Sequence, residues 1–165
     1  MMYTKLDSTV HDPIILRNIK EIIYPQKKIL LGKLMPHFKL LNEKNETISL
    51  DNYQGDFLLI DFWASWCGPC IKQIPKLSDL QNKYSNINFK ILSISIDTDN
   101  KKWLNAIMRE EMKWDNVIDI DNEYSKKLNI KSIPKTFLIN PNGEIIGIDM
   151  NDEEIEKILG EIEKK

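Results

Sequence analysis

The stretch FLLIDFWASWCGPC, residues 57–70, decides the fold of this chain. Its nearly continuous apolar run, Phe57 to Trp63, is typical of a central strand buried on both faces. The run ends in Cys67-Gly68-Pro69-Cys70, and an amphipathic segment follows at once. The sequence therefore predicts a buried strand, a tight turn and a helix that starts at two cysteines, which together indicate a redox centre.

The rest of the chain alternates between short apolar runs and segments of helical period. Strand-helix-strand crossovers early in the order imply parallel pairing, and a late hairpin implies antiparallel pairing. We therefore predict an α/β fold, with a mixed central sheet, helices on both faces and an N-terminal β-hairpin. Strands are expected over 37–41, 47–50, 57–63, 89–96, 117–120, 136–139 and 144–148, and helices over 12–24, 69–84, 101–112, 122–128 and from 151 onward.

The length of 165 residues predicts one main domain that can bury its own core. We expect residues 1–31 to form an arm with a short helix, and residues 32–165 to form the domain. The isoleucines of that helix need cover from the domain, a partner chain or a missing N-terminal domain. The N-terminus does not read as a signal peptide, which is compatible with a cytoplasmic protein or with a trimmed form of an exported one.

Composition excludes several classes of function. A net charge of −2 argues against nucleic-acid binding, which requires a basic face. No run reaches the ~18 apolar residues that a membrane-spanning helix needs. A structural zinc site would need two ligands besides the cysteines, and His11 and His37 are the only histidines. We expect no metal and no cofactor.

The two cysteines are the only ones in the chain, and their spacing suits dithiol chemistry. Free N–H groups and the helix dipole at a helix N-terminus stabilise a thiolate, so Cys67 is predicted to be the exposed nucleophile. Cys70, one turn further, would be the shielded resolving thiol. Gly68 would let a partner's backbone approach closely, and Pro69 would fix the turn.

Asp61 is the one acid in the apolar run before the cysteines. A buried carboxylate is costly and tends to have a raised pKa. Two interpretations stay open from the residues alone. Asp61 is either a strand residue that is partly exposed or hydrogen-bonded, or the proton acceptor for Cys70 during exchange, and we favour the second.

The segment FWASWCGPC resembles the active-site signature of thioredoxins, and the similarity extends from about Gly32 to the C-terminus. A second matching segment, Ile133-Pro134-Lys135-Thr136-Phe137, is similar to the thioredoxin loop whose cis-proline packs beside the disulfide. The resemblance implies that Pro134 is cis, that Ile133 faces the redox centre and that the backbone there pairs with substrate. Trp66, next to Cys67, is expected to be a surface platform for substrate.

Further features resemble the TlpA/ResA branch of thioredoxin-like oxidoreductases, which are grouped with the redoxin and AhpC/TSA-like domains. They are the lead-in at 32–38, the insert between Asp97 and Asp121, and the ending at 136–143. The resemblance implies disulfide-containing protein substrates, an upstream thiol protein as electron donor, and a monomer. It also implies a periplasmic or envelope location in a bacterium, with a cytoplasmic location as the alternative. Trp103 and Trp114 of the insert are expected to be packing residues.

Two positions depart from these families. Many members of the branch carry Glu three residues after the second cysteine, where this chain has Gln73, which cannot titrate. Thioredoxins place a lysine beside the buried acid on the next strand, and our alignment puts Ser93 there. Asp61 would then act without either neighbour.

Three functions remain to be separated. The leading one is reduction of protein disulfides, because Gly-Pro is the pair between the cysteines of thioredoxin. A thiol peroxidase of the AhpC/TSA type is less favoured, because residues 60–67 contain no proline and no hydroxyl three positions before Cys67. A binding module without turnover is the third, and the presence of both cysteines argues against it.

Overall fold

The structure is a computed structural model and describes residues 30–165. The expected helix over 12–24, and with it most of the arm at 1–31, lies outside the described residues. Within 30–165, none of the helices is long and apolar enough to cross a membrane.

Seven strands of the described domain form one mixed sheet in the order β2-β1-β5-β4-β3-β6-β7. Strands β3, β4 and β5 are parallel neighbours, and all other pairs are antiparallel. The predicted α/β class, mixed pairing and N-terminal hairpin are confirmed. The strands are β1 Lys39–Asn42, β2 Thr47–Ser49, β3 Phe57–Trp63, β4 Phe89–Ser95, β5 Asp115–Ile118, β6 Lys135–Ile139 and β7 Ile145–Ile148.

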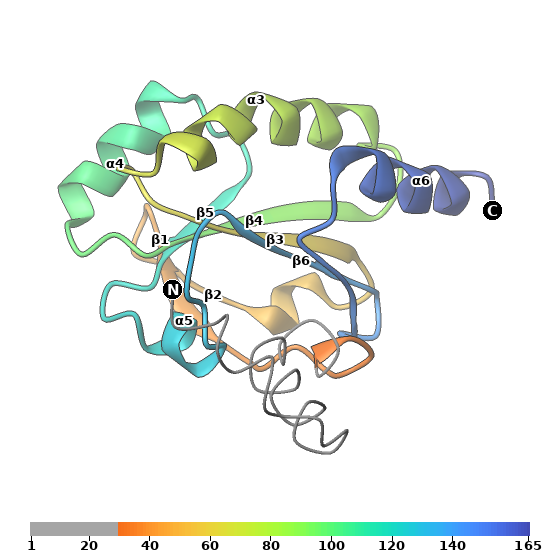
Figure 1. Ribbon diagram of the computed structural model, residues 1–165, viewed down its shortest axis with the longest axis horizontal. Coiled ribbons are helices and arrows are strands. Elements are labelled where there is room, and N and C mark those ends of the chain that lie inside the picture. Colours follow the sequence, from red (N-terminus) through yellow and green to blue (C-terminus); the bar gives the residue numbers. More distant parts are fainter. Residues whose placement is uncertain (1–29) are drawn as a thin grey trace, which may run out of the picture.

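Helices cover both faces of this sheet, as predicted (Figure 1). The longer helices α3, α4 and α6 lie on one face, and α5 and the 3₁₀ helix η1 lie on the other. The bounds are η1 Leu50–Tyr53, α3 Gly68–Lys83, α4 Asn100–Arg109, α5 Glu123–Lys127 and α6 Asp152–Glu163.

Strand β5 begins earlier than the sequence pattern indicated, at Asp115 rather than Val117. Its two opening residues are polar, so the apolar pattern did not mark them. Both side chains have partners in the fold: the Tyr53 hydroxyl donates to Asp115 at 2.7 Å, and the Asn116 amide donates to the Trp114 carbonyl at 2.7 Å. Parallel pairing with β4, in which Asp115 and Asn116 face Leu92 and Ser93, therefore extends the strand beyond its apolar part.

Strand β3 divides its side chains between two cores because successive residues of a strand point to opposite faces. Leu58, Ile60 and Phe62 pack in the core on the η1 and α5 side. Leu59 packs with residues of α3 and α6, and Trp63 packs with both cysteines. Asp61 lies between Leu59 and Trp63 in this alternation, and therefore on the α3 face.

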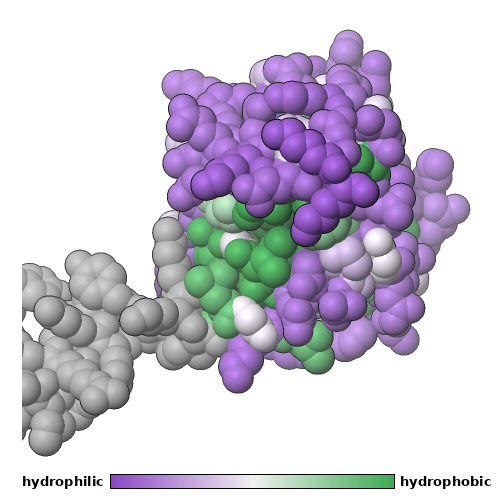
Figure 2. Space-filling model, turned by 90° about the vertical axis from the view of Figure 1, so that its right-hand side faces the viewer, coloured by the Kyte–Doolittle hydropathy of each residue, from purple (hydrophilic) through white to green (hydrophobic). Residues whose placement is uncertain are grey.

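The surface of the domain is not uniformly polar, and Figure 2 shows one face on which apolar residues gather below a hydrophilic region. Among residues 30–165, the large apolar side chains that are exposed belong to Leu31, Leu34, Leu41, Trp66, Met108 and Ile120. Only Trp66 adjoins the cysteines in the chain, so it is the exposed apolar group that bears on the candidate site.

Candidate active site

Cys67 and Cys70 form a disulfide at the junction of β3 and α3, with their Cα atoms 5.2 Å apart. Cys67 is the N-cap of α3, and its sulfur accepts a hydrogen bond from the Cys70 N–H at 3.3 Å. Pro69 lies in the first turn, a position where its missing N–H breaks no helical bond. The helix begins at the cysteines, as the sequence predicted.

Both cysteines are buried in this disulfide-bonded form, with Cys67 5% and Cys70 2% exposed. The expectation that Cys67 is exposed is therefore wrong for the oxidised state. The reason is packing, because the disulfide is part of an apolar cluster that includes Trp63 and Trp103.

Exposed residues flank the disulfide along the chain. Trp66 is 67% exposed, and Gly68 and Pro69 are also exposed. A Cβ placed on Gly68 would meet no atom within 4 Å, so there is open space above this residue. The rim formed by these three residues leaves room for another chain to approach.

The loop before β6 also reaches the redox centre. The Ile133–Pro134 peptide bond is cis, as the resemblance implied. Ile133 is partly buried and packs against the cluster that contains both cysteines. A segment more than sixty residues from the motif in sequence is thus brought to the disulfide.

Asp61 is fully enclosed beneath α3, and the residue is 2% exposed. Its Oδ2 accepts a hydrogen bond from the Ser93 hydroxyl at 3.3 Å, while its Oδ1 has no hydrogen-bond partner among the described residues. Burial raises the pKa of Asp61 to about 7, and the Ser93 bond opposes that rise. A proton can therefore enter or leave this carboxyl near neutral pH.

Ser93 stands where our alignment placed it, directly beside Asp61 on the neighbouring strand β4. Its Oγ also accepts a hydrogen bond from Trp114 Nε1 at 2.9 Å, which the sequence did not suggest. Gln73 lies on α3 and is partly buried, and its Oε1 has no hydrogen-bond partner within residues 30–165.

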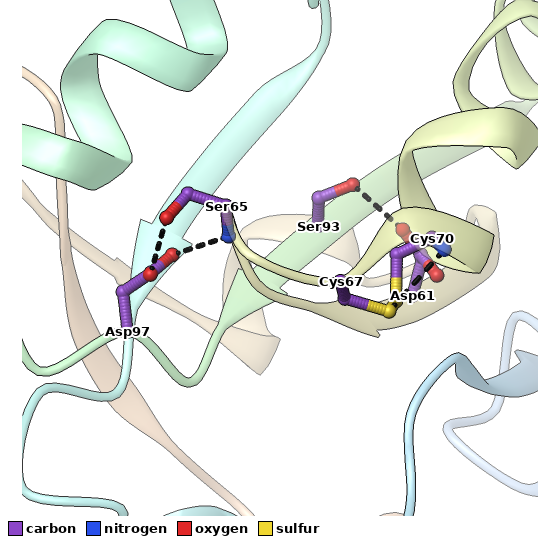
Figure 3. Close-up of a disulfide and its surroundings, with 6 residues drawn as sticks. All are labelled: Asp61, Ser65, Cys67, Cys70, Ser93 and Asp97. Carbon is purple, nitrogen blue, oxygen red and sulfur yellow. Dashed lines mark hydrogen bonds between the residues drawn. A yellow bond between two sulfur atoms is a disulfide. The ribbon is translucent and has the colours of Figure 1, made fainter.

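Asp97 is a second buried acid near the cysteines, and sequence reasoning did not select it (Figure 3). Its carboxylate accepts hydrogen bonds from the Ser65 N–H at 2.8 Å, the Ser65 hydroxyl at 2.7 Å and the Ser95 hydroxyl at 2.7 Å. It thereby ties the end of β4 to the loop that precedes Cys67. Because the carboxyl ends of adjacent parallel strands meet at one sheet edge, the positions of Ser65 and Asp97 after two such strands were the available signal.

The arrangement suits two-electron exchange between a dithiol and a disulfide. It holds two sulfurs at a helix N-terminus, an exposed rim and a buried acid that changes protonation near neutral pH. Within the part of the chain that the structure describes, no group of three or more His, Cys, Asp or Glu side chains is arranged to hold a metal ion.

The chain is similar to known thiol–disulfide oxidoreductases. The AhpC/TSA family model matches residues 31–148. The thiol-disulfide oxidoreductase ResA of Bacillus thuringiensis subsp. konkukian is 27% identical over 140 residues, which cover 85% of this chain and 80% of ResA.

Solved structures point the same way. A thiol-disulfide oxidoreductase from Bacteroides fragilis is 35% identical, with a TM-score of 0.73, and the match covers 79% of this chain and 99% of that one. The thioredoxin domain of a thiol-disulfide oxidoreductase from Bacteroides vulgatus is 24% identical with a TM-score of 0.74, covering 80% and 96% of the two chains. The second likeness shows the thioredoxin fold.

Proposed function

The chain belongs to the AhpC/TSA family, as a thiol–disulfide oxidoreductase of the TlpA/ResA type, and we propose that it reduces disulfides of other proteins. The observation that carries the proposal is the cysteine pair at the N-terminus of α3, with the buried Asp61 beneath that helix. Oxidoreductases of this kind act on disulfide-containing substrates and exchange electrons with thiol partners.

In the first step the Cys67 thiolate attacks one sulfur of a substrate disulfide. That S–S bond breaks, the second substrate sulfur leaves as a thiolate that takes up a proton, and a mixed disulfide remains on Cys67. The N–H groups at the start of α3 and the helix dipole favour the thiolate form of Cys67. The Cys70 N–H already donates to the Cys67 sulfur.

In the second step Cys70 attacks the Cys67 sulfur of the mixed disulfide. Asp61 accepts the Cys70 proton, the Cys67–Cys70 disulfide forms as the bond from Cys67 to the substrate breaks, and the substrate sulfur that was bonded to Cys67 leaves as a thiolate that takes up a proton. Two electrons have passed from the dithiol to the substrate. A thiol-bearing donor protein then returns two electrons and completes the cycle.

The rim residues would hold the substrate during both steps. We assign Trp66, Gly68 and Pro69 to one side of the bound chain, because they are exposed beside the disulfide. We assign Ile133 and Pro134 to the other side, because Ile133 packs against the cysteine cluster.

Reduction rather than oxidation is proposed from the two residues between the cysteines. Thioredoxin, which has the same Gly-Pro pair, has a reduction potential of about −270 mV, whereas the oxidant DsbA has one of about −120 mV. Equilibration with glutathione buffers should give a potential close to the thioredoxin value. A potential near that of DsbA would contradict the direction proposed.

Insulin-disulfide reduction tests the activity itself. Wild type should precipitate insulin in the presence of a dithiol donor, and Cys67→Ser should abolish this activity because the attacking sulfur is gone. Cys70→Ser should stall after the first attack and accumulate a mixed disulfide that is visible by non-reducing electrophoresis. Consumption of hydrogen peroxide far faster than by free cysteine, without insulin reduction, would instead favour the peroxidase alternative.

We also propose that the protein works as a monomer in the bacterial cell envelope, on the strength of the TlpA/ResA resemblance. Cell fractionation and gel filtration test these two points. Recovery in the cytoplasmic fraction, or elution at the size of a dimer, would contradict them.

A further inference from the structure

Asp61 is the near end of a two-link hydrogen-bond chain that leads away from the cysteines. Ser93 Oγ donates to Asp61 Oδ2 at 3.3 Å, and Trp114 Nε1 donates to Ser93 Oγ at 2.9 Å. Ser93 is 0% exposed, so the described residues leave its hydroxyl no contact with solvent. The three side chains come from β3, β4 and the segment just before β5.

The chemistry of the three groups fixes which of them donates and which accepts in each hydrogen bond. An indole N–H is only a donor, so Trp114 must use an acceptor lone pair of Ser93. A carboxylate is only an acceptor, so the single hydrogen of the Ser93 hydroxyl is directed to Asp61. The serine is thereby held as a donor to the ionised form of the acid.

No other polar group of the described domain offsets the burial of Asp61. The pKa of Asp61 has two influences, desolvation and the Ser93 bond, and no charged side chain contributes. On β6, Thr136 is the register partner of Asp61, and the adjacent Lys135 is bound to Asp149 at 2.7 Å. On α3, Cys70 lies beside Asp61 (Figure 3), and it is held in the disulfide in this form.

We propose that Trp114 is a positioning residue, which acts through Ser93 to hold a fixed donor on the carboxylate that receives the Cys70 proton. This inference rests on the proposed function, in which Asp61 accepts that proton. It assigns to Trp114 a role beyond the packing expected from the sequence. It also gives the Ser93 hydroxyl, a neutral donor, a defined role at the position where thioredoxins place a lysine.

Trp114 is suited to this role by its location. It is only partly buried, and one part of it lines a groove of about 270 Å³ together with Ile74, Pro75, Ser78 and Lys113. Its indole nitrogen points inward, since it reaches Ser93. Trp114 thus reaches from the surface groove to the serine that binds the buried acid.

Direct titration of Asp61 tests the proposal without any assay of activity. In the oxidised protein, the side-chain carboxyl of Asp61 is followed by carbon-13 NMR in wild type, Ser93→Ala, Trp114→Phe and the double variant. Ser93→Ala should raise the midpoint by about one pH unit, because a hydrogen bond to the charged form is lost. Trp114→Phe should raise it by less, and the double variant should match Ser93→Ala alone.

Two controls separate this role from simple packing. Trp103 is a buried tryptophan whose Nε1 has no hydrogen-bond partner among residues 30–165, so Trp103→Phe should leave the Asp61 midpoint unchanged. Ser93→Thr keeps the hydroxyl and should restore the wild-type midpoint. The indole N–H signal of Trp114, but not that of Trp103, should shift in step with Asp61 titration.

The proposal is overturned if Trp114→Phe and Ser93→Ala leave the midpoint in place, or if Trp103→Phe moves it as much as Trp114→Phe does. A functional readout separates this failure from failure of the proposed function. Insulin reduction by Ser93→Ala should need a higher pH than wild type, and in an Asp61→Asn background the serine change should shift nothing. Normal insulin reduction with an unmoved Asp61 midpoint would reject the Trp114 role and leave the reductase standing.

Discussion

Asp61 and Asp97 are both buried acids, each 2% exposed, yet their carboxylates accept very different numbers of hydrogen bonds. Asp97 accepts three hydrogen bonds of 2.7–2.8 Å from Ser65 and Ser95. Asp61 accepts one long bond of 3.3 Å, and its other oxygen has no partner among the described residues. Two aspartates with the same exposure thus differ in hydrogen bonding: the oxygens of Asp97 are well supplied with donors, and those of Asp61 are not.

Two buried acids near the same disulfide therefore have different roles, one in stabilising the fold and one in the chemistry. Hydrogen bonds to a charged group offset the cost of burying it, so Asp97 can act as a structural tie for the loop before Cys67. Asp61 lacks that compensation, and burial raises its pKa to about 7. The poorly satisfied acid is therefore the one suited to proton transfer near neutral pH.

Removing the Asp97 carboxylate, which ties β4 to the loop before Cys67, should have the largest effect on stability. Asp97→Ala leaves three buried or half-buried donors without their acceptor, and we expect it to lower the free energy of unfolding by about 4–5 kcal/mol. Insulin reduction should fall with it, because the loop before Cys67 loses its anchor. Urea unfolding measures the loss. Asp99→Ala is the matched control, since Asp99 caps α4 with two backbone bonds and should cost only about 1 kcal/mol.

Replacing Asp61 should raise the stability of the protein, whereas replacing Asp97 lowers it. Burial raises the pKa of Asp61 from its ordinary value of 3.8 to about 7, so wild-type stability falls as pH rises from about 4 to about 7 and stays lower above. Asp61→Asn has no carboxyl to ionise at this position, so its stability should not fall in this way. The free energy of unfolding of the variant, relative to wild type, should rise by about 4 kcal/mol across that window.

Unfolding by urea at pH 4, 5.5, 7 and 8 checks the sign and the window. The same variant should reduce insulin about 100-fold more slowly, because the proton acceptor is gone. If Asp61→Asn is less stable than wild type at pH 7, or equally active, the contrast between the two acids fails.

The smallest effect is expected from one partner of the tie. Ser65→Ala removes the hydroxyl that donates to Asp97 Oδ1 but keeps the backbone N–H bond to Oδ2, so the loss should be about 2 kcal/mol. Ser85→Ala, at an exposed position after α3, should change stability by less than about 0.5 kcal/mol. Equal losses in the two variants would show that Asp97 is not held as described.

Much of the candidate site could be predicted from the sequence because its signals are local. The apolar run before Cys67 and the helical period after Cys70 predicted β3 and α3, and both are present. The resemblance also placed Ile133 and a cis Pro134 at the redox centre. The burial of Cys67 was not predicted, because it depends on what packs over the disulfide.

The sequence by itself determined the α/β class, the position of the dithiol and the presence of an acid within an apolar strand. These depend on residue types and spacings within a few positions, where side-chain period and helix capping act. Only the tertiary structure decided which partners each acid has. Ser93 and Asp61 are 32 residues apart in the chain, as are Ser65 and Asp97, and Trp114 is 21 residues from Ser93. Such pairs meet through strand register and packing, so the proton affinity of the redox centre is set by contacts that no local pattern encodes.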